Sequence, residues 1–314
     1  MLSSIRHLIA NKISGIQRIM LRSYFFDFYL PEARRRKKRP DFDVNIYINH
    51  IDPHFGDISI SKISKPSLNA WLDDQIAMGL QKSTINKHIC LLNKLLVSAY
   101  EGGHMSNYSE SLHKLKQIHI SHFRQRFLSS SEIEKVLECC ERSIHPYVKF
   151  FVELLLLTGA RSGEALGAKW CDINFASKIW TVPVSKTGKT RYIYLNEHSL
   201  TLLTSLRDHS TKLHGQIKES DYIFKNPTTK KKYKGMHAAW YKIRNDAGIG
   251  EVRIHDLRHT YASILVNQGA SLYDVQKLLG HSSPQMTQRY AHLSSERLLS
   301  ATVIVGNFIR PNTQ

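Results

Sequence analysis

The chain has 314 residues, of which 42% are hydrophobic and 22% charged; this is a globular composition and excludes a disordered or collagen-like chain. Its net charge is +18, of which residues 1–120 contribute +7 and residues 121–314 contribute +11. A basic excess in both halves is expected if two parts of the protein face one polyanion, although simple solubility is an alternative. Because no apolar run approaches the roughly 20 residues that cross a bilayer, we expect a cytoplasmic protein without membrane contact.

The first 120 residues are predicted to be helical. Apolar residues recur at helical spacing over 67–79 and 84–100. A dense basic run precedes these segments and consists of Arg34, Arg35, Arg36, Lys37, Lys38 and Arg39. Such a run is either a solvated face or a contact with nucleic-acid phosphates. Residues 113–126 are basic, rich in histidine and without apolar periodicity, which predicts a linker between two domains.

Beyond this linker the pattern becomes mixed. Ser131 and Glu134 are spaced as a capping box that opens a helix, and the apolar run 147–157 predicts a buried helix. Two strand-like runs, 179–183 and 191–195, flank a polar turn and predict a β-hairpin. The remainder is predicted to be helical. Its last element is a short helix, opened by Pro284, that carries Tyr290.

Two arginines in this second part are candidate phosphate ligands. Arg161 follows the buried helix on a glycine-flanked turn, where its guanidinium would present a fixed fork to a phosphate. Glu164 lies three residues later and would orient it; an ordinary surface ion pair is the alternative. Arg258 shares one helical face with His255 and His259, because Arg258 and His259 lie three and four positions after His255.

The sequence predicts neither a metal site nor a nucleotide loop. His255 and His259 have the spacing of two zinc ligands, but the residues between them do not form an HExxH motif, and a metal would lie close to Arg258. A GxxxxGK[ST] motif is absent from the sequence. Three further polar residues stand out individually as weak signals: Lys186 on the hairpin turn, His281 after a glycine, and Tyr290.

In their order along the chain, these residues resemble the tyrosine recombinase (phage integrase) family. The resemblance rests on the blocks TGARSGE (158–164), HDLRH (255–259) and LGH (279–281), followed by Tyr290. It implies a mainly α fold with a small β-hairpin or sheet, arranged as a two-domain DNA clamp. Its parts would be an N-terminal extension (1–23), a helical, SAM-like core-binding domain (24–120), and a catalytic domain with a C-terminal tail (121–314).

The family resemblance also implies the chemistry, which is site-specific DNA recombination or integration through a 3′-phosphotyrosyl intermediate without metal or cofactor. Arg161 and Arg258 would clamp the scissile phosphate, with Glu164 in support, and His281 would add a hydrogen bond.

The resemblance assigns the proton transfers to three further residues. Tyr290 would attack the phosphorus, His255 would accept or relay its proton, and Lys186 would protonate the departing 5′-oxygen.

The partners implied are double-stranded DNA and a homo-tetramer on paired recombination sites, with accessory DNA-bending proteins as a further option. The basic run at 34–38 would face DNA, as would Lys230, Lys231 and Lys232, for which a solvated loop is the alternative. Two other functions remain open: an inactive architectural factor with the same fold, and a type IB topoisomerase. The complete set of active-site residues favours an active enzyme over the first, and the resemblance of residues 24–120 to a core-binding domain argues against the second.

Overall fold

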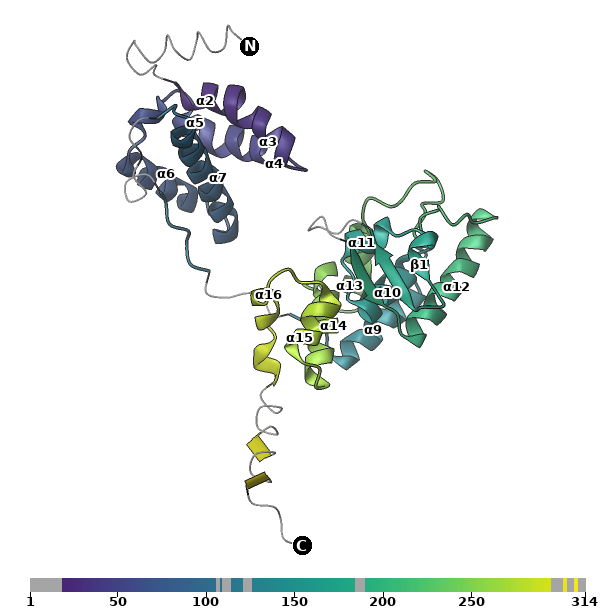
Figure 1. Ribbon diagram of the computed structural model, residues 1–314. Coiled ribbons are helices and arrows are strands. Elements are labelled where there is room, and N and C mark those ends of the chain that lie inside the picture. Colours follow the sequence, from purple (N-terminus) through teal and green to yellow (C-terminus); the bar gives the residue numbers. More distant parts are fainter. Residues whose placement is uncertain are drawn as a thin grey trace. The chain divides into compact units, whose positions relative to one another are not determined.

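The computed structural model describes residues 19–105, 108, 114–120, 126–183, 190–294, 302–303 and 308–309. The chain divides into two compact units with the boundary between residues 123 and 124 (Figure 1). Each unit has its own hydrophobic core. The fold is mainly helical with one small antiparallel sheet, which confirms the predicted fold class. Among the described helices, none is both long and apolar enough to cross a membrane.

All regular elements described in the first unit are helical. They are α2 (Leu21–Tyr24), η1 (Phe25–Tyr29), α3 (Leu30–Arg36), α4 (Asp41–Ile46), η2 (Tyr47–Ile51), α5 (Asp52–Phe55), η3 (Ile60–Lys62), α6 (Lys65–Ala77) and α7 (Lys82–Glu101). Two of them, η1 and η2, are π-helical turns. Phe25 of η1 stacks on Tyr47 of η2 with ring centroids 3.8 Å apart, so an aromatic contact joins the two turns in the core. Leu21 is also fully buried.

Residues 114–120 of the predicted linker are held onto the first unit. Asn86 donates to the carbonyl of Ile118 and accepts from its amide, at 2.9 and 2.8 Å. Asn93 makes the same pair of bonds to Leu115 at 2.9 and 3.0 Å. The two asparagines are seven residues apart and therefore share one face of α7. This segment has no helix or strand, as expected of a linker, but it packs on α7 along these residues.

The second unit surrounds a buried helix. Its elements are α9 (Ser130–Glu141), α10 (Val148–Thr158), α11 (Ser162–Gly167), η4 (Trp170–Asp172), β1 (Ile173–Asn174), β2 (Ile179–Val182), β3 (Arg191–Tyr194), α12 (Glu197–His214), α13 (His237–Asp246), α14 (Ile254–Asn267), α15 (Leu272–Leu279), α16 (Gln285–Gln288) and η5 (Ala291–Ser294). Helix α10 packs against α9, α11, α12 and α14, which explains why its residues are largely apolar. It ends at Gly159, whose φ of 60° is left-handed and accessible to glycine at little cost.

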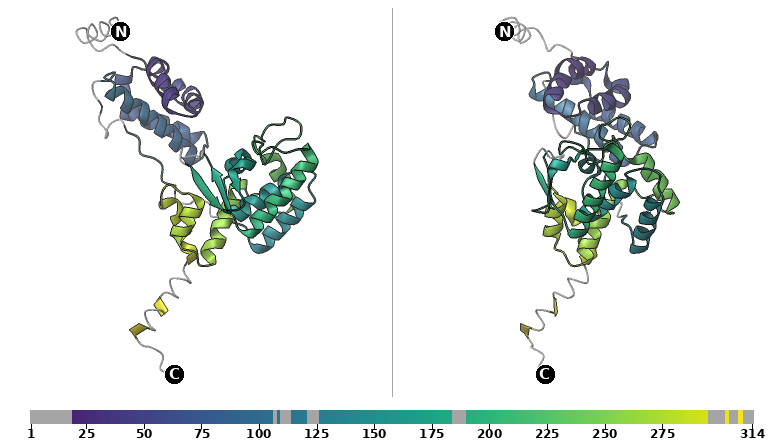
Figure 2. Two further views of the ribbon diagram at one scale, coloured as in Figure 1. Left: turned by 45° about the vertical axis from the view of Figure 1, so that its right-hand side comes forward. Right: turned by 90° about the vertical axis from the view of Figure 1, so that its right-hand side faces the viewer.

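The predicted hairpin is present as β2 and β3, which pair antiparallel with Val182 opposite Arg191. Strand β1 adds a third strand, which the sequence pattern did not predict because it has two residues. Figure 2 shows the hairpin strands at one edge of the helices of this unit. The backbone on either side of the turn is joined by Thr190, whose hydroxyl donates to the carbonyl of Pro183.

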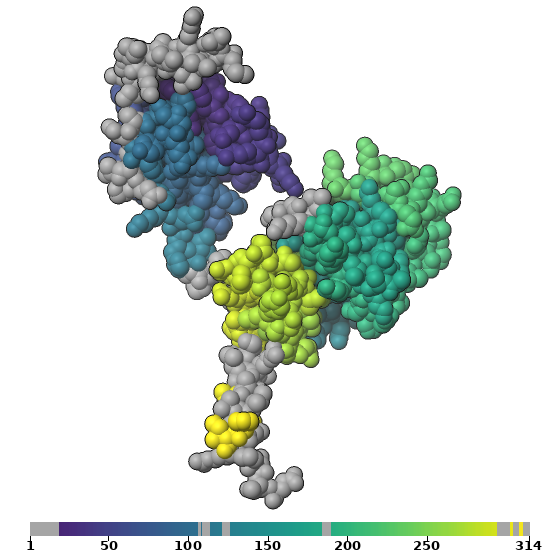
Figure 3. Space-filling view, in the orientation of Figure 1, coloured from purple at the N-terminus to yellow at the C-terminus, as the bar shows by residue number. Residues whose placement is uncertain are grey.

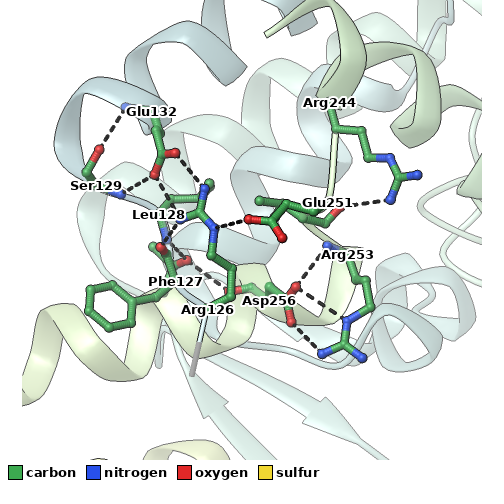
Figure 4. Close-up of polar contacts among 11 residues, drawn as sticks. Arg126, Phe127, Leu128, Ser129, Glu132, Arg244, Glu251, Arg253 and Asp256 are labelled. Atoms are coloured by element: carbon green, nitrogen blue, oxygen red, sulfur yellow. Dashed lines mark hydrogen bonds and ion pairs between the residues drawn. The ribbon is translucent and has the colours of Figure 1, made fainter. Parts of the chain in front are cut away.

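Two local predictions were wrong. The capping box that opens α9 uses Ser129 and Glu132, two residues before the predicted pair. Both pairs fit the pattern, but Arg126 binds both carboxylate oxygens of Glu132 and fixes the earlier one (Figure 4). In addition, α16 ends at Gln288, so Tyr290 follows this helix and does not lie on it.

Candidate active site

Helix α14 carries the HDLRH block and is anchored at its first turn. Asp256 is fully buried and accepts from the backbone amide of Arg253, which makes it a helix cap (Figure 4). One turn later, Thr260 accepts from the backbone amide of Leu128 at 2.9 Å. The segment before α9 is thus joined to α14. The backbone that carries Arg258 and His259 is held in place on both sides, at Asp256 and at Thr260.

Arg258 is 3% exposed and bound at both ends of its fork. One amino group donates to the carbonyl of Gly159 at 2.7 Å and the other to the carbonyl of Leu279 at 2.5 Å. Burial, followed by the charges of Arg161 and Arg191, lowers the pKa of Arg258 to about 9. The group is still positive at neutral pH, and it cannot rotate without breaking two hydrogen bonds.

Arg161 is the N-cap residue of α11 and is hydrogen-bonded to Glu164. The carboxylate of Glu164 accepts from the Arg161 side chain at 2.7 Å and from its backbone amide at 2.9 Å. Glu164 has a second partner that was not predicted: Arg191 on β3 donates to the same carboxylate at 2.6 Å. A pattern of alternating strand residues shows a polar position at Arg191 but gives no indication of this ion pair.

The three arginines meet at the end of α15. Three consecutive carbonyls there accept from three different guanidinium groups: Leu278 from Arg191 at 2.7 Å, Leu279 from Arg258 at 2.5 Å, and Gly280 from Arg161 at 3.4 Å. The last carbonyls of a helix have no partner within it and form the negative end of its dipole. This helix end therefore gathers three cations from distant segments into one place. In the space-filling view, the yellow-green surface of the last part of this unit lies against its teal surface (Figure 3).

Tyr290 is 5% exposed and its hydroxyl oxygen lies 2.5 Å from Nδ1 of His259. The other ring nitrogen of His259 lies 3.3 Å from an amino group of Arg289. The ring of His255 makes an edge contact with that of His259, at 4.9 Å between centroids. Sequence reasoning gave His259 no role, although its position beside His255 on one helical face was the available signal. Burial raises the pKa of Tyr290, and the charges of Arg289 and Arg258 oppose that shift.

The predicted histidines are neutral in this environment. Burial, followed by the charges of Arg258 and Arg161, lowers the pKa of His281 to about 3. Burial and the charge of Arg258 also lower the pKa of His255. His281 follows α15, and its Nδ1 lies 2.7 Å from the hydroxyl of the buried Thr287, a contact that the sequence did not indicate.

Of the predicted catalytic residues, Lys186 lies outside the described residues. The structure brings the other five, with Glu164, into the second unit around α14 and the end of α15; they are Arg161, His255, Arg258, His281 and Tyr290. Over the residues that the structure describes, His, Cys, Asp and Glu side chains form no group that could hold a metal ion.

Some of the predicted DNA-contact residues form ion pairs within the protein, and the others are exposed to solvent, with no such pair among the described residues. In the first unit, Arg36 pairs with Glu32, and Lys37 pairs with Asp43. The remaining members of the basic run are exposed, namely Arg34, Arg35, Lys38 and Arg39. In the second unit, the side chains of Lys230, Lys231 and Lys232 are exposed on the connection between α12 and α13.

The fold and this set of side chains define an enzyme of the tyrosine recombinase class, which acts on DNA. A family model described as the phage integrase family matches residues 126–297, and the chain belongs to this family.

Individual relatives agree with this assignment. The chain is 26% identical over 269 residues to the tyrosine recombinase XerD of Proteus mirabilis, covering 77% of this chain and 84% of that protein. Five other curated integrases and recombinases are matched over 46 to 60% of their own length.

Two solved structures share the fold. The Tn1549 transposon integrase in complex with transposon right end DNA has a TM-score of 0.72 at 16% identity, and covers 90% of this chain and 100% of that one. A lambda integrase tetramer bound to a Holliday junction has a TM-score of 0.68 at 23% identity, and covers 90% of this chain and 80% of that one.

Proposed function

We propose that the chain is a site-specific recombinase whose Tyr290 cleaves one DNA strand and holds it as a 3′-phosphotyrosyl ester. The observation that carries this proposal is the arginine cluster at the end of α15 beside a buried tyrosine. A phosphodiester is unreactive because its charge repels nucleophiles and its alkoxide leaves poorly. A site without metal must therefore supply fixed cations at the phosphate and a proton for the leaving oxygen.

In the proposed cleavage step, one bond to phosphorus forms as another breaks, and residues of the chain carry both proton transfers. The oxygen of Tyr290 forms a bond to phosphorus, and the bond between phosphorus and the 5′-oxygen breaks. His255 accepts or relays the proton of Tyr290, and Lys186 gives a proton to the departing 5′-oxygen. Because one phosphate ester replaces another, the 5′-hydroxyl of a second DNA strand can reverse the step without ATP.

Positive charge near the phosphate is supplied by Arg161 and Arg258, with Glu164 holding the first. The double hydrogen bonding of Arg258 supports this role, since a preorganised cation loses little free energy to reorientation in the transition state. His281 is neutral beside these arginines, and its imidazole would donate a hydrogen bond to a phosphate oxygen as charge accumulates.

The assembly is proposed from the family. We assign residues 24–120 to DNA binding and 121–314 to catalysis, preceded by an extension over 1–23. The partners are duplex DNA and a homo-tetramer on paired sites, for which the lambda integrase tetramer of like fold is the support. Accessory DNA-bending proteins would assist at sites that must be bent. The place of action is the cytoplasm, in contact with DNA.

Covalent-adduct trapping tests the proposal. The protein is incubated with genomic DNA of its source and denatured in detergent, and the DNA that stays attached is sequenced. We expect 3′-linked adducts at a few sites, absent with Tyr290→Phe and retained with Tyr273→Phe, a tyrosine that is 64% exposed. Loss of adducts in both variants, or their retention in Tyr290→Phe, contradicts the role of Tyr290. Binding without adducts in the wild type would favour an architectural factor, and scattered adducts would favour a topoisomerase.

A further inference from the structure

His259 lies between Arg289 and Tyr290, with one ring nitrogen directed at each (2.5 Å to the Tyr290 oxygen, 3.3 Å to the arginine). We propose that Arg289 fixes His259 as its Nδ1–H tautomer, so that His259 donates a hydrogen bond to the nucleophilic oxygen and does not take its proton. This inference rests on the proposed role of Tyr290 and adds a catalytic residue and a positioning residue to that site.

The direction of the two hydrogen bonds follows from the chemistry of arginine. A guanidinium has five N–H donors and no acceptor. Nε2 of His259 must therefore accept from Arg289, and it cannot carry a hydrogen. A neutral imidazole has a single ring proton, which is then on Nδ1. The contact to Tyr290 is a donation from His259, and the tyrosine oxygen is the acceptor.

The surroundings of His259 keep the ring neutral. Its side chain is 9% exposed, and burial, followed by His255 and Arg289, lowers its pKa to about 4. The charges of Asp256 and Arg253, on the first turn of α14 and just before it, oppose each other with smaller effects. The other residues that line the narrow pocket beside the ring are Arg126, Phe127, Ser263, His292 and Leu293. Protonation at Nε2 would direct a hydrogen at the Arg289 amino group, which the geometry disfavours.

A donor at this position acts on the transition state. As Tyr290 attacks, its oxygen loses a proton and carries partial negative charge, and a hydrogen bond to a charged acceptor is stronger than one to a neutral acceptor. The bond from His259 therefore stabilises the attacking oxygen more than the resting phenol. Because the His259 hydrogen already occupies one lone pair of the oxygen, the tyrosine hydrogen points elsewhere. His259 is thus excluded as the acceptor of that proton, which leaves His255 in this role.

The tautomer can be measured without any activity. Histidine nitrogens are labelled with ¹⁵N in the full-length protein, and long-range proton–nitrogen spectra distinguish Nδ1–H from Nε2–H rings. The His259 signal is identified by its absence in His259→Asn. We expect an Nδ1–H ring between pH 6 and 8 that becomes a mixture of tautomers in Arg289→Met. An Nε2–H ring, an imidazolium in this range, or a tautomer unaffected by Arg289→Met would overturn the proposal.

Single-turnover adduct formation tests the consequence for catalysis. His259→Asn retains an N–H close to the Nδ1 position, whereas His259→Phe keeps a ring without a donor. We expect cleavage to fall by about 10- to 100-fold in the Phe variant and to be restored largely in the Asn variant, with DNA affinity and thermal midpoint similar in both. Equal rates in the two variants contradict a donor role.

A substrate with sulfur in place of the bridging 5′-oxygen separates attack from departure. A thiolate leaves without a proton, so this substrate should rescue Lys186→Ala but not His259→Phe. Rescue of His259→Phe would place its effect on the leaving group and overturn the proposal. If the proposed function itself fails, the wild-type protein forms no adduct on either substrate, while the tautomer experiment still gives its own answer.

Discussion

The carboxylate of Glu164 and the guanidinium of Arg191 form a buried ion pair, with 2.6 Å between Oε2 and Nη1 and side chains that are 6% and 7% exposed. The other oxygen of Glu164 accepts from Arg161. Arg191 follows the hairpin turn directly and also binds the carbonyl of Leu278. One carboxylate thus links the hairpin to the arginine proposed to hold the phosphate.

Breaking this pair is expected to destabilise the fold. Glu164→Gln leaves two arginines close together without their carboxylate, and Arg191→Met leaves a buried carboxylate with one partner fewer. Each should lower the free energy of unfolding by about 3 to 5 kcal/mol. In urea denaturation of the full chain, the double variant should be destabilised by clearly less than the sum of the two single effects. Additive effects would mean that the pair does not interact.

Gly280 and Gly163 form a matched pair for substitution by alanine. Gly280 has a φ of 60°, and a Cβ there would lie 2.6 Å from Nε of Arg191, so Gly280→Ala combines backbone strain with displacement of a buried side chain. We expect a loss of about 1 to 3 kcal/mol. Gly163 lies in α11 with nothing within 4 Å of a Cβ, and Gly163→Ala should be neutral or stabilising by up to about 1 kcal/mol. Thermal unfolding distinguishes the two, and similar midpoints would contradict the strain at Gly280.

Arg258→Lys is expected to damage cleavage far more than DNA affinity. A single ammonium does not bridge the carbonyls of Gly159 and Leu279 as the fork does, so the charge loses its fixed position. Adduct formation should fall by at least about 100-fold, while the Kd for DNA, measured at fixed salt, changes by a few-fold, because many other cations contribute to affinity. A normal cleavage rate would remove Arg258 from the proposed site.

We expect the fold to lose stability in acid, because it buries histidines in their neutral form. The pKa values of His88 and His259 are lowered to about 4, by burial first and by neighbouring cationic or histidine side chains second. Their unfolded-state pKa is about 6.5, so the unfolded chain binds the proton more readily. Stability is therefore full above about pH 6.5 and declines as pH falls toward 4, by up to about 1.4 kcal/mol per pH unit for each histidine.

The contribution of His88 can be isolated. The free energy of unfolding is measured between pH 7 and 4.5 for the wild type, for His88→Gln and for the exposed control His237→Gln. His88→Gln removes the titrating ring beside Gln75 and should flatten the pH dependence, whereas His237→Gln should leave it unchanged. An unchanged slope in His88→Gln would show that His88 does not contribute.

The lysines between α12 and α13 predict a salt effect. If they bind phosphates, Lys230→Gln combined with Lys231→Gln should reduce the slope of log K against log salt by about 0.9 for each phosphate that is no longer neutralised. Lys212→Gln, an exposed residue of α12, serves as the control. An unchanged slope would assign the two lysines to a solvated loop.

Much of the second unit could be predicted because its signals are local. Gly159 and Gly280 end α10 and α15 as expected, since both have the left-handed backbone that glycine favours. The hairpin follows from two short strand-like runs around a polar turn. Arg161, Arg258 and His281 lie together around the end of α15, and their shared role at a phosphate stays a prediction.

The contacts between distant segments could not be predicted. The three carbonyls at the end of α15 belong to the backbone, so no residue type marks them as arginine ligands. The contact between His259 and the hydroxyl of Tyr290 could not be predicted either. His255 and His259 share a helical face, so their spacing alone does not say which of them contacts the tyrosine, and Tyr290 itself follows α16, where the sequence suggested that it lies on the helix.

The arginines at the end of α15 stabilise the fold in addition to their proposed role in chemistry. This determines which residues a relative without cleavage activity would keep. A relative without cleavage activity would still need a donor for each of the three carbonyls, so selection for folding alone would retain the arginines. Tyr290 is bound through its hydroxyl to one imidazole, so phenylalanine in its place would leave the single buried N–H donor of His259 unpaired, at a cost of about 1 to 3 kcal/mol. The tyrosine, and not the arginines, therefore distinguishes an active descendant from a silent one.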